Sequence, residues 1–137
     1  MADFPRILLI DGNDEDRNYY AHRLQVSLPD CVVVQAVTGR AGLAVCKHNS
    51  IDCVVFELDL PDMSGFEVLL KLVPRVQHPE IPLILLTRLS NPHLLEAAVS
   101  NGAQAALHKS MTSGDMLDKA VLKAIATVRQ DKLAGRN

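Results

Sequence analysis

The chain has 137 residues, which is the size of one ordinary domain built around one hydrophobic core. Hydrophobic residues make up 48% of it and charged residues 22%, a composition typical of a soluble globular protein and not of a disordered chain. The 14 basic and 16 acidic side chains give a net charge of −2, which argues against direct nucleic-acid binding because that usually requires a basic surplus. No apolar run approaches the roughly 20 residues that span a bilayer. Since the N-terminus also lacks a signal-peptide pattern, we expect a cytoplasmic protein with no membrane contact.

Short β-like runs alternate with amphipathic helical segments along the chain. Several of the β-like runs are continuously apolar, as expected for strands that helices cover on both faces. The predicted strands are Ile7–Ile10, Cys31–Ala36, Cys53–Phe56, Leu83–Leu86 and Ala105–Leu107. The predicted helices lie near residues 14–27, 39–48, 65–73, 91–101 and 113–130.

The helix boundaries carry recognisable signals. A helix usually begins after a residue whose short polar side chain accepts a bond from the first turn, and it often ends before a glycine. The expected N-terminal caps are Asn13, Thr38 or Gly39, Ser64, and Asn91 followed by Pro92. Gly102 follows the fourth helix, where a left-handed residue is favoured.

This alternation predicts an α/β domain, a doubly wound parallel five-stranded sheet with helices on both faces and right-handed crossovers. A closed eight-stranded barrel would need nearly twice the length. We expect one domain over residues 1–130 and a polar C-terminal tail over residues 131–137. The stripes Leu94, Leu95, Ala98, Val99 and Met116, Leu117, Ala120, Val121, Ala124 are expected to face mostly the core.

Polar side chains follow the predicted strands where ligands collect in open parallel sheets, at the strands' carboxyl ends. Asp11 comes after the first strand, and Glu57 and Asp59 come after the third. Thr87 follows the fourth strand and Lys109 follows the fifth. The sequence therefore predicts a site for a cation, for a phosphoryl group, or for both.

Cysteines and histidines give no sign of a metal or redox site. Cys31, Cys46 and Cys53 form no C-x-x-C pair and lie in apolar stretches, so we expect buried, reduced thiols. The 5 histidines are scattered, with no two at ligand spacing, and a metal site built from them is not expected.

One stretch carries a family resemblance, IDCVVFELDLPDMSGFEVLLKL at residues 51–72. A hydrophobic strand there leads to Leu60-Pro61 and then to Gly65, and Glu57 lies four positions before the proline. Together with the landmarks Asp11, Thr87 and Lys109 in order, this resembles the receiver domain of response regulators, from about residue 6 to about residue 128. The resemblance implies a flavodoxin-like, CheY-like fold with strand order 2-1-3-4-5.

The resemblance also implies a chemistry. In that family an aspartate takes a phosphoryl group from a phosphohistidine or a small phosphodonor, while magnesium and a lysine neutralise the developing charge. Glu57 stands at the phosphoacceptor position, and Thr87 and Lys109 stand at the phosphoryl-binding and switch positions. The implied magnesium ligands are Asp11, Glu57 and the backbone carbonyl of Asp59.

The sequence departs from the family pattern at positions that serve phosphorylation or its readout. Glu57 replaces the nucleophilic aspartate, and Gly12 replaces a carboxylate that would bind magnesium directly. Ala106 occupies the place of the aromatic switch residue. Ser110 replaces the proline after the lysine, and Arg88 replaces a small residue after the threonine.

These departures leave alternatives open. Glutamate reaches about 1.5 Å further than aspartate, which disturbs an in-line transfer that needs its reacting atoms about 3–3.5 Å apart. Without a carboxylate at Gly12, magnesium is expected to bind weakly at most. Glu57 is then either an inert remnant or a fixed mimic paired with Lys109; alternatively Glu57, or less readily Asp59, is a working phosphoacceptor with Mg²⁺.

Two further charges have simple expectations. Asp14 either replaces the metal ligand missing at position 12 or is a surface charge in the first turn of its helix, and we favour the surface charge. The side chain of Arg88 either bonds Glu57 or points into solvent, and we favour solvent.

The sequence thus predicts a two-component receiver that acts through protein contacts and is not an enzyme. Its expected partners are a sensor histidine kinase, a phosphotransfer protein or an output domain, and a homodimer through the fourth helix, fifth strand and fifth helix. A small enzyme on the same scaffold is the competing class. A flavodoxin would need a Ser/Thr/Gly-rich phosphate loop where DGNDEDR is acidic, and a dinucleotide binder would need G-x-G-x-x-G, so no organic cofactor is expected.

Overall fold

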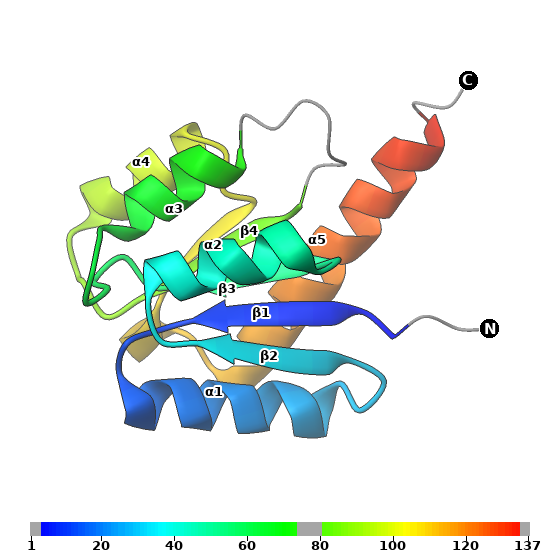
Figure 1. Cartoon of the computed structure of the whole chain (residues 1–137), viewed down its shortest axis with the longest axis horizontal. Helices are drawn as coiled ribbons and strands as arrows, with labels where there is room; N and C mark the ends of the chain where they lie inside the picture. The colour runs from blue at the N-terminus through cyan, green and yellow to red at the C-terminus, as the bar shows by residue number, and fades with distance from the viewer. Residues whose placement is uncertain (1–3, 74–80, 135–137) are drawn as a thin grey trace.

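The structure, a computed structural model, describes residues 4–73 and 81–134. Within these residues parallel strands alternate with helices (Figure 1). The strands are β1 (Arg6–Ile10), β2 (Val32–Ala36), β3 (Cys53–Phe56), β4 (Leu83–Thr87) and β5 (Ala105–His108). The helices are α1 (Asp14–Ser27), α2 (Gly39–His48), α3 (Gly65–Leu72), α4 (Pro92–Ser100), the short 3₁₀ helix η1 (Lys109–Met111) and α5 (Gly114–Ala134).

The sheet has the order β2-β1-β3-β4-β5, with neighbouring strands parallel throughout, so the predicted fold and strand order are confirmed. Because all strands run the same way, their carboxyl ends form one rim, at the left of Figure 1. The chain passes from β1 outward to β2 and then returns to β3 on the other side of β1. The end of β1 and the end of β3 therefore flank the switch in strand order, where such sheets bind ligands.

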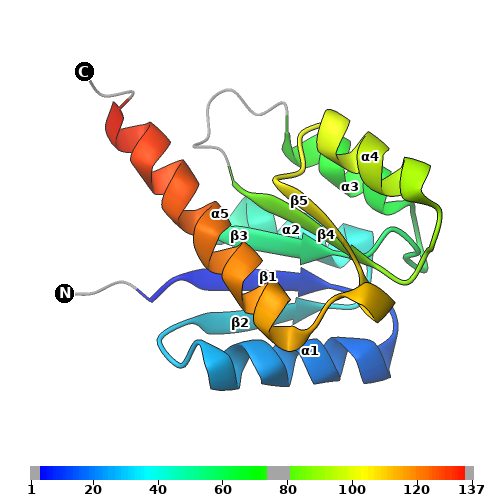
Figure 2. The same ribbon diagram turned by 180° about the vertical axis from the view of Figure 1, so that it is seen from behind.

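Helices cover both faces of the sheet. Helices α1 and α5 lie on one face and α2, α3 and α4 on the other (Figures 1 and 2). Every residue of β3 and β4 is buried. Alternate residues of β4 serve the two cores: Ile84 and Leu86 pack toward α1 and α5, and Leu83 and Leu85 toward the other face. Since a fully buried aliphatic side chain stabilises the fold by about 1.5–3 kcal/mol, these two strands fix the middle of the sheet.

The predicted helix starts are confirmed, including Thr38, and not Gly39, as the cap of α2. Each cap's side-chain oxygen accepts a bond from a backbone N–H of the first turn: Asn13, Thr38, Ser64 and Asn91. Pro92 is the first residue of α4, and Gly102 after that helix has a φ of +117°, a conformation that favours glycine.

Two finer expectations, the end of α5 and the burial of Cys46, are wrong. Helix α5 continues to Ala134, into the segment expected to be a tail, because residues 131–134 include the good helix formers Lys, Leu and Ala; residues 135–137 lie outside the described part. The stripes of α4 and α5 face mostly the core as predicted, while Val99 and Met116 are 50% and 48% exposed, since only one stripe of each helix can face the sheet. Cys31 and Cys53 are buried as predicted, but Cys46 is partly exposed.

No helix in the described residues is long and apolar enough to cross a membrane.

Candidate functional site

The carboxylate of Glu57 lies at the end of β3, where the side chain is only 2% exposed. Its Oε2 atom accepts hydrogen bonds from the backbone N–H of Leu58 at 2.6 Å and of Asp59 at 3.1 Å. The hydroxyl of Thr87, the last residue of β4, donates a third bond to the same oxygen. One carboxylate oxygen is therefore fully engaged by donors from two strand ends.

The second oxygen of Glu57, Oε1, is engaged as well. It accepts a bond from the backbone N–H of Arg88 at 3.0 Å and lies 3.2 Å from the ammonium nitrogen of Lys109. The Glu57 carboxylate thus collects donors from the ends of β3, β4 and β5. An ionised group bound this way has its solvation replaced by fixed dipoles and one cation.

Lys109 is the basic residue that the acidic side chains of the site surround. Its Nζ atom lies 2.7 Å from Asp11 Oδ2 and 2.8 Å from Asp16 Oδ2, in addition to its contact with Glu57. Burial alone would lower the pKa of Lys109, but its hydrogen bonds with Asp11 and Asp16 outweigh burial and raise the pKa above its ordinary value. The lysine therefore stays charged.

The loop after β1 holds Asp11 in place. Asp11 Oδ1 accepts the backbone N–H of Asn13 at 2.9 Å. Arg17, a buried arginine of α1, donates from Nη1 to the backbone carbonyl of Asp11 at 3.0 Å and from Nε to Gln35 at 3.1 Å. Arg17 also pairs with the exposed Asp14 at 2.8 Å, which confirms Asp14 as a surface charge of the first helical turn.

Gly12 has no room for a side chain. A Cβ atom added there would lie 2.6 Å from Cδ and 2.7 Å from Cγ of Pro61. Real Cβ atoms do not approach other carbons so closely, so the ring of Pro61 would have to shift. The position at which the resemblance implies a metal-binding carboxylate is thus covered by the loop that follows β3.

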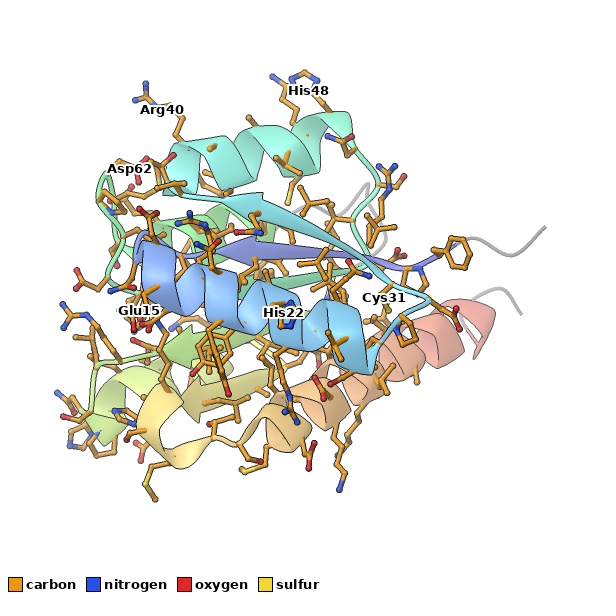
Figure 3. The ribbon with its side chains drawn as sticks, turned by 90° about the horizontal axis from the view of Figure 1, so that it is seen from below. Glu15, His22, Cys31, Arg40, His48 and Asp62 are labelled. Carbon is orange, nitrogen blue, oxygen red and sulfur yellow. The ribbon has the colours of Figure 1, made fainter. Side chains whose placement is uncertain are left out.

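The same loop is tied to α2. Asp62 accepts the backbone N–H of Gly39 at 2.8 Å through Oδ1 and that of Arg40 at 2.9 Å through Oδ2. Figure 3 shows Asp62 beside the start of α2, near Arg40. The bond from the Arg40 N–H is the main reason why the pKa of Asp62 is lowered. Asp62 therefore caps α2 from outside the helix.

At the outer edge of the site, the exposed side chains of Arg88 and Asp59 form an ion pair. The predicted solvent position of the Arg88 side chain is close to what is found, although its guanidinium contacts Asp59. What the sequence did not predict is that the backbone N–H of Arg88 binds Glu57. Asp59 likewise reaches Glu57 through its backbone N–H and not through its carboxylate.

Ala106 lies in β5 opposite Leu85 of β4 and packs, half-buried, against the core under α4. Thr87 pairs with His108, two residues further along β5. Because side chains alternate along a strand, Ala106 lies on the same face of the sheet as Thr87 but one step further from the rim. The methyl side chain of Ala106 therefore supplies no aromatic ring that could change position when Thr87 moves.

The residues present do not fit a divalent metal ion. Magnesium demands near-octahedral oxygen ligands with one or two carboxylates, but both oxygens of Glu57 and of Asp11 already accept hydrogen bonds or contact Lys109. Gly12 supplies no oxygen from a side chain. In the described part of the chain, no group of three or more His, Cys, Asp or Glu side chains is arranged to hold a metal ion.

The structure thus brings together the predicted Asp11, Glu57, Thr87 and Lys109. Sequence reasoning missed Asp16 and Arg17 as parts of this site. The sequence signal for Asp16 was the Asn13 cap. This cap makes Asp16 the third residue of α1, a position whose side chain points back toward the rim.

Comparisons with known proteins show the family of this chain. The family described as "Response regulator receiver domain" matches residues 7–121. The chain is 28% identical to the transcriptional regulatory protein UhpA of Escherichia coli K12, over 95% of this chain and 70% of that protein. It is 26% identical to hybrid signal transduction histidine kinase D of Dictyostelium discoideum, over 97% of this chain. It spans 9% of that kinase and 16% of the regulatory protein LuxO of Vibrio vulnificus, which it also matches.

Solved structures share the fold. The signal receiver domain of a putative LuxO repressor protein from Vibrio parahaemolyticus superposes with a TM-score of 0.84 at 22% identity, covering 95% of this chain and 96% of that one. A response regulator receiver domain protein from Clostridium thermocellum superposes with a TM-score of 0.81 at 25% identity, covering 94% and 98%.

Proposed function

Since the chain belongs to the response regulator receiver family, we propose that it is a two-component receiver in which the Glu57 carboxylate permanently occupies the phosphoryl site. Such a receiver works through protein contacts and not through aspartyl phosphorylation. The observation that carries the proposal is the set of donors on Glu57: backbone N–H groups, the Thr87 hydroxyl and the Lys109 ammonium.

A phosphoryl group bound at this rim would need the same donors, because its oxygens are also anionic acceptors. Glu57 already accepts bonds from the Thr87 hydroxyl and the Arg88 N–H, and its Oε1 atom lies 3.2 Å from the Lys109 ammonium. Each hydrogen bond to a charged group contributes about 1.5–3 kcal/mol. Phosphoryl transfer would have to break several of these bonds before a phosphorus atom came within in-line reach, about 3–3.5 Å. This favours a fixed mimic over an inert, solvated remnant.

The alternative is a working phosphoacceptor that uses Glu57, or less readily Asp59, with Mg²⁺. Incubation with a small acyl-phosphate donor and magnesium chloride, followed by intact mass measurement, separates the two. We expect no acid-labile addition of one phosphate, while a receiver domain with aspartate at this position, treated in parallel, is labelled. Efficient labelling that Glu57→Gln abolishes would overturn the proposal.

The partners that we propose are those of receivers: a sensor histidine kinase, a phosphotransfer protein or an output domain, on the same or another chain. We also propose that the protein acts in the cytoplasm, without enzymatic activity or an organic cofactor.

For a second copy of this chain we propose the face made by α4, β5 and α5, where β5 is the edge strand of the sheet (Figure 2). Val99 and Met116 are 50% and 48% exposed on the two helices of this face. Exposed apolar side chains there support a contact surface. Sedimentation at increasing concentration tests the dimer: Val99→Asp should weaken it, and Val26→Asp, on the exposed side of α1, should not. A monomer at all concentrations would contradict it.

A further inference from the structure

The cation at the centre of this site is a side chain. Three carboxylate oxygens, from Asp11, Asp16 and Glu57, lie 2.7, 2.8 and 3.2 Å from Nζ of Lys109. These residues come from the loop after β1, from α1 and from the end of β3. Two of these contacts, with Asp11 and Asp16, are hydrogen bonds from the ammonium, and the third, with Glu57, is an ion pair. The side chains of Lys109, Asp11 and Glu57 are 8%, 3% and 2% exposed, whereas Asp16, at 36%, reaches the cluster from the solvent side.

We infer that Lys109 is the resident cation of this receiver site, that Asp16 replaces the carboxylate absent at Gly12, and that the site is assembled without a divalent metal ion. The inference goes beyond the proposed function, because a receiver that cannot be phosphorylated could still bind magnesium. It concerns which cation neutralises the buried carboxylates.

Magnesium would have to compete with Lys109 for the same atoms. Asp11 has one oxygen on the Asn13 N–H and the other on Lys109, so a magnesium ion bound there would share these oxygens with their donors and place its charge beside the ammonium. At 2.0–2.1 Å from its ligands, magnesium also requires the oxygens to close around it. Displacement from Asp11 and Glu57 would leave a buried ammonium with Asp16 as its remaining carboxylate, and an incompletely paired buried charge is costly.

Asp16 is the positioning residue that completes the arrangement. It lies in the first turn of α1, and its backbone N–H donates to the Asn13 cap at 2.9 Å while its carboxylate accepts from Lys109. Glu15 is the adjacent acid in the same helical turn and is exposed (Figure 3), so it shares the interaction with the helix dipole but makes no bond to Lys109. Glu15→Gln is therefore a matched control for Asp16→Asn.

The first test compares these two variants by thermal unfolding and by NMR of the Lys109 ammonium. Asp16→Asn should lower Tm by roughly 4–8 °C, the effect of losing one charged hydrogen bond, and should shift the Lys109 signal. Glu15→Gln should lower Tm by less than about 2 °C and leave the signal in place. Equal behaviour of the two variants would overturn the role of Asp16.

The second test titrates the unmodified protein with magnesium chloride, against sodium chloride of equal ionic strength. We expect no saturable shift of the Lys109 ammonium signal and no rise in Tm beyond that of the salt control. A ligand at 100 times its Kd would raise stability measurably, so a saturable shift with a higher Tm would overturn the inference. Magnesium binding alone would not contradict the proposed function. Only covalent phosphorylation of the protein would do that.

Discussion

Glu57→Gln removes the charge of the central carboxylate and keeps its shape, so its effect on stability follows from the donors around it. If the new amide nitrogen takes the place of Oε1, it faces the Arg88 N–H and the Lys109 ammonium, both of which are donors. If it takes the place of Oε2, it faces the N–H groups of Leu58 and Asp59 and the adjacent Thr87 hydroxyl.

In the second orientation two N–H groups lose their acceptor, since only the hydroxyl can rotate to accept. In the first, the Arg88 N–H loses its acceptor and the amide faces the Lys109 ammonium. An unsatisfied buried donor costs about 1–3 kcal/mol, so we expect Glu57→Gln to lower the free energy of unfolding by roughly 1–6 kcal/mol. Urea unfolding followed by circular dichroism measures this as a lower midpoint with an unchanged m-value. Glu67→Gln, at an exposed position in α3, should stay within about 0.5 kcal/mol. A loss of stability below about 1 kcal/mol for Glu57→Gln would show that the surrounding donors do not depend on the Glu57 carboxylate.

Gly12→Ala should lower the free energy of unfolding by about 1–3 kcal/mol, because the new Cβ overlaps the ring of Pro61; a variant as stable as the parent in urea would show that the loop yields freely. Asp62→Asn should cost about 0.5–1 kcal/mol at pH 7, as the loss of a charged helix cap does. The folded pKa of Asp62 is lowered, so its contribution is present above the unfolded pKa of about 3.9 and is lost as the pH falls through the folded pKa. The difference in stability between the parent and the Asp62→Asn variant in acid-titrated unfolding should therefore shrink below that pH, and a constant difference would contradict the charge assignment. Asp115→Asn should change stability by less than about 1 kcal/mol, although its bond to Arg23 is 2.6 Å long, because Asp115 is 79% exposed; thermal unfolding checks this, and a larger loss would show that the pair locks α1 to α5.

The sheet could be predicted from the sequence because its central strands are continuous apolar runs with no competing pattern. Residues 53–56 are buried on both faces, as such a run implies. The meeting of Glu57, Thr87 and Lys109 also follows from topology alone, since parallel strands present their carboxyl ends at one rim.

Other parts of the site depend on side-chain directions that a sequence does not reveal. Asp16 looked like one of three equivalent acids at a helix start, yet its helical position alone turns it toward Lys109. Arg17 would ordinarily be a surface residue, but its buried guanidinium holds the Asp11 carbonyl. The hydrogen bond from the Arg88 backbone N–H to Glu57 does not involve the arginine side chain, so the residue type at this position does not predict it.

The most direct test of the central claim follows the backbone N–H signals of Asp59 and Arg88 by NMR while a small acyl-phosphate donor and magnesium are added. Both N–H groups donate to Glu57, so any phosphoryl group that enters must take them over. If Glu57 occupies the phosphoryl site, both signals stay where they are in the untreated protein. A second set of signals for these two residues, growing with phosphate incorporation, would contradict it.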